Sequence, residues 1–436
     1  MARAFQARGA ESQIAQKYLI VRWSRGLTVA FVSCALAVCA GSANAQDDRP
    51  YVAAFDRYMT PAAGTIDLLS IDHALNAVED RWLPPARFDE PGWFKRALGI
   101  GYRFGKWYGV DQPQDHFVMV VAHEVFGHGS RLREIGADGI RYSFDAPTPY
   151  GGGGAVTEFT GEVLVTRADL LAIDTGGIEA QNQLADHIGR QSLAIGAIHY
   201  RDAWLYLHSR IDGLRYIRSV SPRSPPGHDV ASFLEDVNDG CEPPDCSRLT
   251  ASALKRRAWS MLADPMLAYA AYDWAVSYIV RGRTFGPLPM IPLGGDVGYL
   301  PALRFEMTPF GTEWSTDNYI LRHGRMTTAT IGIGDTLAKP AWRLGVIAND
   351  VVRRERWSAD VRANIWRQPD LDSPPTGQVN RVGGMAAATA RVRVGSEGFA
   401  RRAGWFVEAG YKSDGFVRGE RLHAGAILRV GVTLTR

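Results

Sequence analysis

The strongest constraint on the fold is an alternation of apolar and polar residues from about residue 300 to the C-terminus. In residues 341–349, AWRLGVIAN, Trp342 and Leu344 fall on one side of an extended chain and Arg343 on the other. Successive side chains of a strand point to opposite faces, so this period of two predicts antiparallel strands. The pattern predicts strands near residues 302–308, 314–321, 327–334, 341–349, 356–366, 385–394, 404–412 and 420–435.

These runs resemble the strands of Gram-negative outer-membrane β-barrels, in which the apolar face contacts lipid and the polar face lines the interior. Their length, roughly 8 to 11 residues, is close to what a tilted strand needs to cross a bilayer. The resemblance implies a closed barrel of about eight strands and contact with outer-membrane lipid. One departure is the C-terminus, VTLTR, where such barrels usually end on an aromatic residue. A soluble β-domain with its apolar face turned inward is the alternative. Charged residues recur in the middle of the runs, on the polar face: Arg343, Asp360, Arg362, Arg391, Arg393 and Arg429. Aromatic residues lie near the ends of the runs: Trp342, Trp357, Trp405 and Tyr411.

The N-terminus has the pattern of an export signal. A basic stretch precedes the apolar run LTVAFVSCALAVCA, residues 27–40, and SANAQDD offers a cleavage site after Ala45. We therefore predict a signal peptide at residues 1–45 and location in the outer membrane, with the periplasm as the alternative. A lipoprotein anchored at Cys39 ranks second, because the preceding Val38 fits poorly.

Removal of residues 1–45 changes both the charge and the cysteine content. It takes away five basic residues and one acidic residue, leaving 44 basic against 45 acidic. This balance gives no electrostatic reason to expect nucleic acid as a partner. Cys241 and Cys246 remain in CEPPDC, which predicts a small disulfide loop in an oxidising compartment, with two free thiols as the alternative.

The pattern divides the mature chain into two parts. Residues 46–280 show helical periods and predict a mainly helical region. Its stretch HEVFGH, residues 123–128, resembles the metal-binding motif of zincins. Residues 281–299 are rich in glycine and proline and predict a connector. Residues 300–436 predict the antiparallel barrel. The expected fold class is therefore α+β.

A candidate metal site lies in the stretch AHEVFGH, residues 122–128, which follows an apolar run. His123 and His128 are five residues apart, and on a regular α-helix such positions lie about 140° apart. They could bind one metal ion only if an extra residue entered the turn, as in a π-bulge. Gly127 would ease that distortion.

This stretch resembles the H-E-x-x-G-H signature of the zinc-dependent dipeptidyl-peptidase III family over six residues. The resemblance implies that His123 and His128 bind zinc and that Glu124 is the catalytic general base that activates a zinc-bound water. It also implies a glutamate ligand on a downstream helix. The family's second motif is absent here.

Glu179 in DTGGIEAQNQLADHIGRQ is the best candidate for the third metal ligand. We expect Gly176 and Gly177 to break the chain and a helix to start there, with Glu179 in its first turn. Glu158 and Glu162 are the next candidates, followed by His187, which could instead contact the ligands or substrate.

Two functions fit these features. The first is a zinc hydrolase of the bacterial cell envelope, with a peptide or a lipid-linked amide or ester as substrate. The second is a non-enzymatic outer-membrane protein whose helical region is structural or binds a partner. The sequence does not identify the substrate.

Overall fold

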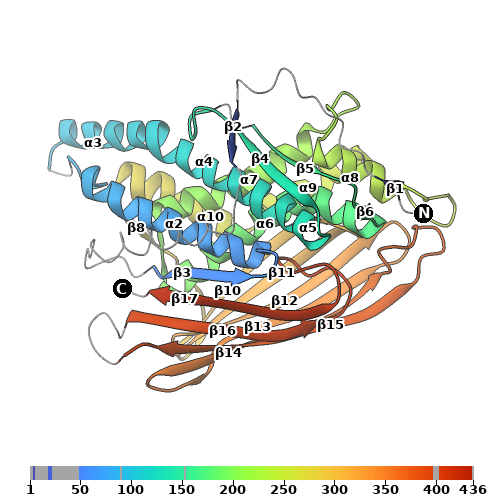
Figure 1. Cartoon of the computed structure of the whole chain (residues 1–436). Helices are drawn as coiled ribbons and strands as arrows, with labels where there is room; N and C mark the ends of the chain where they lie inside the picture. Colours follow the sequence, from blue (N-terminus) through green and yellow to red (C-terminus); the bar gives the residue numbers. More distant parts are fainter. Residues whose placement is uncertain are drawn as a thin grey trace.

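The chain folds into a helical layer packed on one large antiparallel sheet, in agreement with the expected α+β class (Figure 1). The computed structural model describes residues 3–4, 18–21, 49–88, 91–151, 154–395 and 402–434. Most of the predicted signal peptide lies outside the described residues. Its described parts are two short strands, β1 (Arg3–Ala4) and β2 (Tyr18–Val21), which pair with β6 (Leu164–Val165) and β4 (Asp138–Asp145).

The large sheet contains every strand that the alternation predicts. Two further strands join it: β3 (Tyr51–Asp56), which precedes the helices, and β9 (Ile291–Gly294), within the expected connector. The order is β3-β17-β16-β15-β14-β13-β12-β11-β10-β9. The predicted strands are β10 (Val297–Thr308), β11 (Gly311–Arg322), β12 (Arg325–Thr336), β13 (Ala341–Arg353), β14 (Trp357–Pro369), β15 (Asn380–Arg393), β16 (Ala403–Lys412) and β17 (Gly425–Leu434).

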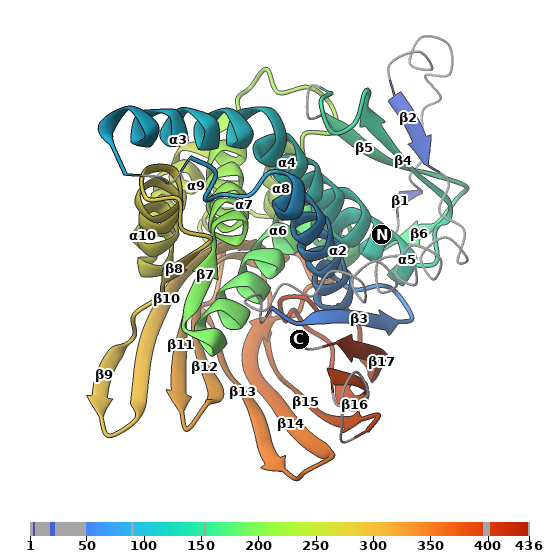
Figure 2. The same ribbon diagram turned by 90° about the vertical axis from the view of Figure 1, so that its left-hand side faces the viewer.

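The sheet is open, which corrects the expectation of a closed barrel of about eight strands. Its edges, β3 and β9, do not pair with each other. The outward amides of β3 are instead bound by the helix α2 (Pro61–Trp82): Val52 N donates to Ser70 Oγ at 2.7 Å and Ala54 N to Asp67 Oδ1 at 2.6 Å. Side chains of a helix thus satisfy donors that a neighbouring strand would satisfy in a closed barrel. Figure 2 shows the sheet curving beneath the helices.

The two faces of the sheet differ sharply in exposure. On the convex face apolar side chains are open to solvent: Leu344 is 48% exposed and Ile333 63%. On the concave face charged side chains are buried in ion pairs, such as Arg343 with Glu313 at 2.5 Å and Arg429 with Glu408 at 2.6 Å. The apolar half of the alternation therefore faces outward.

The helical layer is built around one nearly continuous helix. It comprises α3 (Trp93–Lys106), the π-helix η1 (Trp107–Asp111), α4 (Gln112–Val121), the π-helix η2 (Ala122–His128) and α5 (Gly129–Glu134). Beside it lie α6 (Arg167–Ile195) and α7 (Tyr200–Ser219), which share a buried apolar core with α4, β10 and β11. The remaining helices are α8 (Asp229–Asn238), α9 (Ala251–Ala258), η3 (Trp259–Ala263), α10 (Pro265–Tyr272) and η4 (Asp273–Val280).

Smaller elements complete the layer. β4 pairs with β5 (Ala155–Thr160), and β7 (Ala197–His199) pairs with β8 (Phe285–Pro287). The predicted disulfide between Cys241 and Cys246 is confirmed, with Cα atoms 5.7 Å apart. Within the described parts of the chain, the helices lack the combination of length and apolar character that crossing a bilayer requires.

Candidate metal centre

The two histidines of the motif share one face of their helix. Residues 122–128 form the π-helical segment η2, which confirms the predicted widening of the turn. As a result the Nε2 atoms of His123 and His128 lie 3.1 Å apart despite the spacing of five residues. Both side chains are largely buried, with 12% and 9% of their surface exposed.

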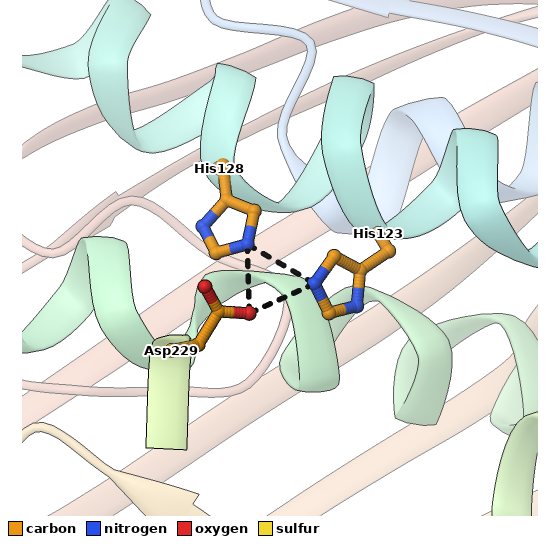
Figure 3. Close-up of side chains that lie close together, drawn as sticks. All are labelled: His123, His128 and Asp229. Carbon is orange, nitrogen blue, oxygen red and sulfur yellow. Dashed lines mark hydrogen bonds and ion pairs between the residues drawn. The ribbon is translucent and has the colours of Figure 1, made fainter. Parts of the chain in front are cut away.

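The third member of the cluster is Asp229, the first residue of α8 (Figure 3). Its Oδ2 atom lies 3.0 Å from His123 Nε2 and 3.2 Å from His128 Nε2. These three residues are the one group of possible metal ligands found among the described residues. The site therefore joins two helices that are about a hundred residues apart in sequence.

The three donor atoms fit a small divalent cation. Zinc ligands at about 2.0–2.1 Å in tetrahedral geometry lie about 3.3 Å from one another. The observed separations of 3.0, 3.1 and 3.2 Å form a nearly equilateral triangle only slightly tighter than that. Two imidazoles and a carboxylate also suit zinc chemically and leave a fourth position open.

His128 is held in the tautomer that a metal ligand needs. Its Nδ1 atom lies 2.8 Å from the carbonyl oxygen of Ile173 on α6, so Nδ1–H can donate there while Nε2 faces the cluster. Burial opposes protonation, but the Asp229 carboxylate raises the pKa of His128 to about 10. Burial likewise opposes ionisation of Asp229, yet the two histidines hold its pKa well below the usual range.

The structure places Glu179 outside the cluster of His123, His128 and Asp229. Its carboxylate accepts hydrogen bonds from Arg131 Nη2 at 2.5 Å and from the backbone amide of Gly419 at 2.7 Å. The expected break at Gly176 and Gly177 is wrong, because α6 runs unbroken from Arg167 to Ile195. Glu179 lies in the middle of that helix and faces the loop between β16 and β17.

Gly176 and Gly177 allow α6 to pack closely against η2 at the site. A Cβ atom on Gly177 would lie 2.2 Å from His123 Nε2, and one on Gly127 would lie 2.6 Å from the carbonyl oxygen of Gly176. The backbones of η2 and α6 thus approach so closely that only glycine fits at both positions. This contact sets the imidazole of His123 against α6.

The other candidates for a third ligand also lie outside the cluster. Glu158 and Glu162 are exposed. His187 is buried, with Nε2 3.1 Å from the carbonyl oxygen of Ala62, and burial lowers its pKa to about 3. Its surroundings are those of a neutral core histidine rather than a ligand of the cluster.

Glu124, next to the first histidine, is buried and oriented by a hydroxyl group. Thr157 of β5 donates from Oγ1 to Glu124 Oε2 at 2.5 Å. The Glu124 carboxylate also contributes to raising the pKa of His128, against the opposing effect of burial and after the larger effect of Asp229. It adds to the effects of burial and Asp229 that raise the pKa of Tyr216. The Glu124 carboxylate therefore lies in the neighbourhood of the cluster.

Sequence reasoning missed Asp229, Thr157 and Tyr216. The Tyr216 ring lies edge-on to His123 with centroids 5.9 Å apart, and its hydroxyl accepts a hydrogen bond from the Asp229 amide at 3.2 Å. The available signal for Asp229 was its place directly after a Pro-Pro-Gly-His turn, at the start of a helical pattern.

Comparisons with protein-family models, with curated proteins and with solved structures found no match to this chain.

Proposed function

We propose that this chain is a zinc-dependent hydrolase that cleaves an amide bond, most simply a peptide bond, in the envelope of a Gram-negative bacterium. The observation that carries the proposal is the cluster of His123, His128 and Asp229 with Glu124 in the same π-helical segment. The resemblance of HEVFGH to the dipeptidyl-peptidase III signature supports the same assignment.

The three clustered side chains would hold the zinc ion, with Asp229 in the role first expected of Glu179. A bound zinc ion would supply Lewis acidity, which makes water more acidic and polarises a carbonyl group. Glu124 would take a proton from the attacking water and pass it to the leaving nitrogen. Thr157 would orient the Glu124 carboxylate for this transfer through its hydrogen bond.

The sheet supports the proposed location. A soluble protein rarely leaves a broad apolar surface open, whereas a membrane strand presents apolar residues to lipid. The convex face has that character over several adjacent strands, and the strands of 10 to 14 residues are long enough to cross a bilayer. We propose that this face contacts outer-membrane lipid and that the helical layer covers the concave face.

The competing proposal is a non-enzymatic membrane protein in which the cluster is a structural metal clip. The two differ on Glu124, because a clip needs the ligands alone. Fluorogenic peptide libraries and lipid-linked amides would be tested with wild type, Glu124→Gln and Glu158→Gln, the last being a matched change at an exposed glutamate. Zinc content would be measured for each.

We expect about one zinc per chain in all three proteins and a loss of at least about a hundredfold in kcat for Glu124→Gln alone. Activity in the Glu124→Gln protein equal to wild type would rule out the proposed mechanism. Zinc bound in the absence of any hydrolysis that depends on Glu124 would favour the structural clip.

A further inference from the structure

A strongly basic pocket lies at one end of the sheet, away from the metal cluster. It has a volume of about 230 Å³ and opens where β13 turns into β14, β15 ends and β16 begins. Asp350 is the one carboxylate among the described residues that line it. The cations lining the pocket are Arg353, Arg354, Arg356, Arg391, Arg393 and Arg402.

The backbone around the pocket is fixed by hydrogen bonds. The register of β13 and β14 shifts between Ala348 and Val352, and Asp350 has a positive φ of 51°. The Asp350 amide donates to Asp360 Oδ1 at 2.9 Å. Within the turn the backbone amide of Arg354 donates to the carbonyl oxygen of Trp357 at 2.8 Å. The backbone amide of Arg393 donates to the carbonyl oxygen of Arg356, also at 2.8 Å. Arg353, Arg354 and Arg356 thus belong to a bulged hairpin, and Arg391 and Arg393 to the neighbouring strand β15.

The charges in the pocket do not balance. Arg391 pairs with Asp360, and Arg353 lies 3.6 Å from Asp350. Among the described residues that line the pocket, Arg354, Arg356 and Arg393 form no ion pair. Guanidinium groups bind phosphate oxygens in pairs of parallel hydrogen bonds, so converging arginines are typical of phosphate sites. The pocket is suited to a phosphate-bearing anion.

The surroundings favour a lipid as the source of that phosphate. Trp357 and Trp405 are 46% and 47% exposed, and each pairs with Val392 across the sheet, so the three form one row on the convex face. Arg391 and Arg393 lie in the two rows on either side of this one and point to the concave side. Aromatic side chains with basic groups at the same level are typical of a membrane–water interface.

We propose that this pocket binds the phosphate group of an anionic lipid. The choice of a lipid rests on the proposed membrane contact of the convex face, whereas the choice of a phosphate group rests on the pocket alone. Because Arg391 and Thr433 also line the cavity of about 580 Å³ between the sheet and α6, the bound headgroup lies at the mouth of that cavity.

The test is calorimetric titration of the full chain in a neutral detergent. The probes are dihexanoyl phosphatidic acid, the matching phosphatidylcholine and inorganic phosphate, with the heat of transfer to empty micelles subtracted. The variant Arg354→Gln/Arg393→Gln removes two pocket cations. The control Arg322→Gln/Arg325→Gln removes two exposed arginines from the β11–β12 turn, at the same end of the sheet.

We expect phosphatidic acid to bind at least tenfold more tightly than either other probe. We expect its affinity to fall at least tenfold in the pocket variant and less than twofold in the control. Equal losses in both variants would show diffuse attraction and overturn the site. Inorganic phosphate binding as tightly as the lipid would overturn the lipid assignment, and absence of binding would overturn the proposal. None of these results depends on hydrolytic activity, so they are separate from the test of Glu124.

Discussion

Gly177 of α6 lies directly against the imidazole of His123, with no room for a methyl group between them. A Cβ atom at this position would come within 2.2 Å of Nε2, the atom that faces the metal cluster. Gly177, which carries no donor group, thus controls the position of one histidine of the candidate metal site. This relationship gives the most direct test of the cluster.

We predict that Gly177→Ala weakens zinc binding by about tenfold to a hundredfold, the range seen when the support of a ligand is disturbed. Gly189→Ala is the matched control on the same helix, since its Cβ would meet nothing closer than 3.8 Å. That control should bind zinc normally and unfold at the same or a slightly higher temperature, because alanine favours the helix. Competition with a chelating dye would measure both affinities; equal affinities in the two variants would contradict the assigned geometry.

Asp229 and Glu179 can be distinguished by separate effects on metal and on stability. Asp229→Ala should reduce zinc to well below one per chain while the fold is retained. Glu179→Gln should keep zinc but lower the free energy of unfolding by about 3 kcal/mol or more, because it leaves buried Arg131 without one of its carboxylates. Metal analysis beside denaturant unfolding would show this, and the reverse pattern would restore Glu179 as the ligand.

The sequence predicts the local features of this protein well. The alternation identifies eight strands of the sheet because a period of two follows directly from the geometry of an extended chain. The spacing of His123 and His128 likewise predicts a widened turn, because no regular helix could bring the pair together.

The features that depend on distant contacts were not predictable in the same way. The alternation of β17 does not reveal that this strand pairs with β3, nearly four hundred residues earlier. It also does not reveal that side chains of α2 accept hydrogen bonds from the amides of β3. Asp229 reaches the histidines only because α8 packs on α6. The sequence predicts a chain break at Gly176 and Gly177, because nothing local indicates that η2 packs against these two glycines.

Asp174, on α6 near the cluster, should make stability depend on pH. Burial, with the Asp236 and Asp229 carboxylates, raises the pKa of Asp174 to about 9. In the unfolded chain the pKa of this group is about 3.9. Because the folded-state pKa is higher, the contribution of Asp174 to the free energy of unfolding is complete below a pH of about 3.9 and is lost as pH rises toward 9. The loss is at most about 1.4 kcal/mol per pH unit.

We therefore predict that Asp174→Asn, which mimics the protonated acid, raises the melting temperature of the metal-free chain more at pH 8 than at pH 5. Asp245→Asn, an exposed change in the disulfide loop, should produce no such trend. Thermal unfolding followed by circular dichroism at both pH values would measure the difference. A gain that is the same at pH 5 and pH 8 would argue against an ionising Asp174.

The convex face of the sheet allows a test of the proposed membrane contact. Leu344 and Ile365 are 48% and 47% exposed and oppose each other on neighbouring strands near the middle of the sheet. Arginine at the middle of a membrane strand costs about 2–4 kcal/mol, so Leu344→Arg/Ile365→Arg should greatly reduce insertion into vesicles.

Val351→Arg/Val352→Arg, exposed near the β13–β14 turn, should have a much smaller effect because charge near the interface costs little. Protection from protease in vesicles would report insertion. If both double variants inserted into vesicles as well as the wild-type protein, the convex face would not be the surface that contacts lipid. A protein partner would then have to cover it.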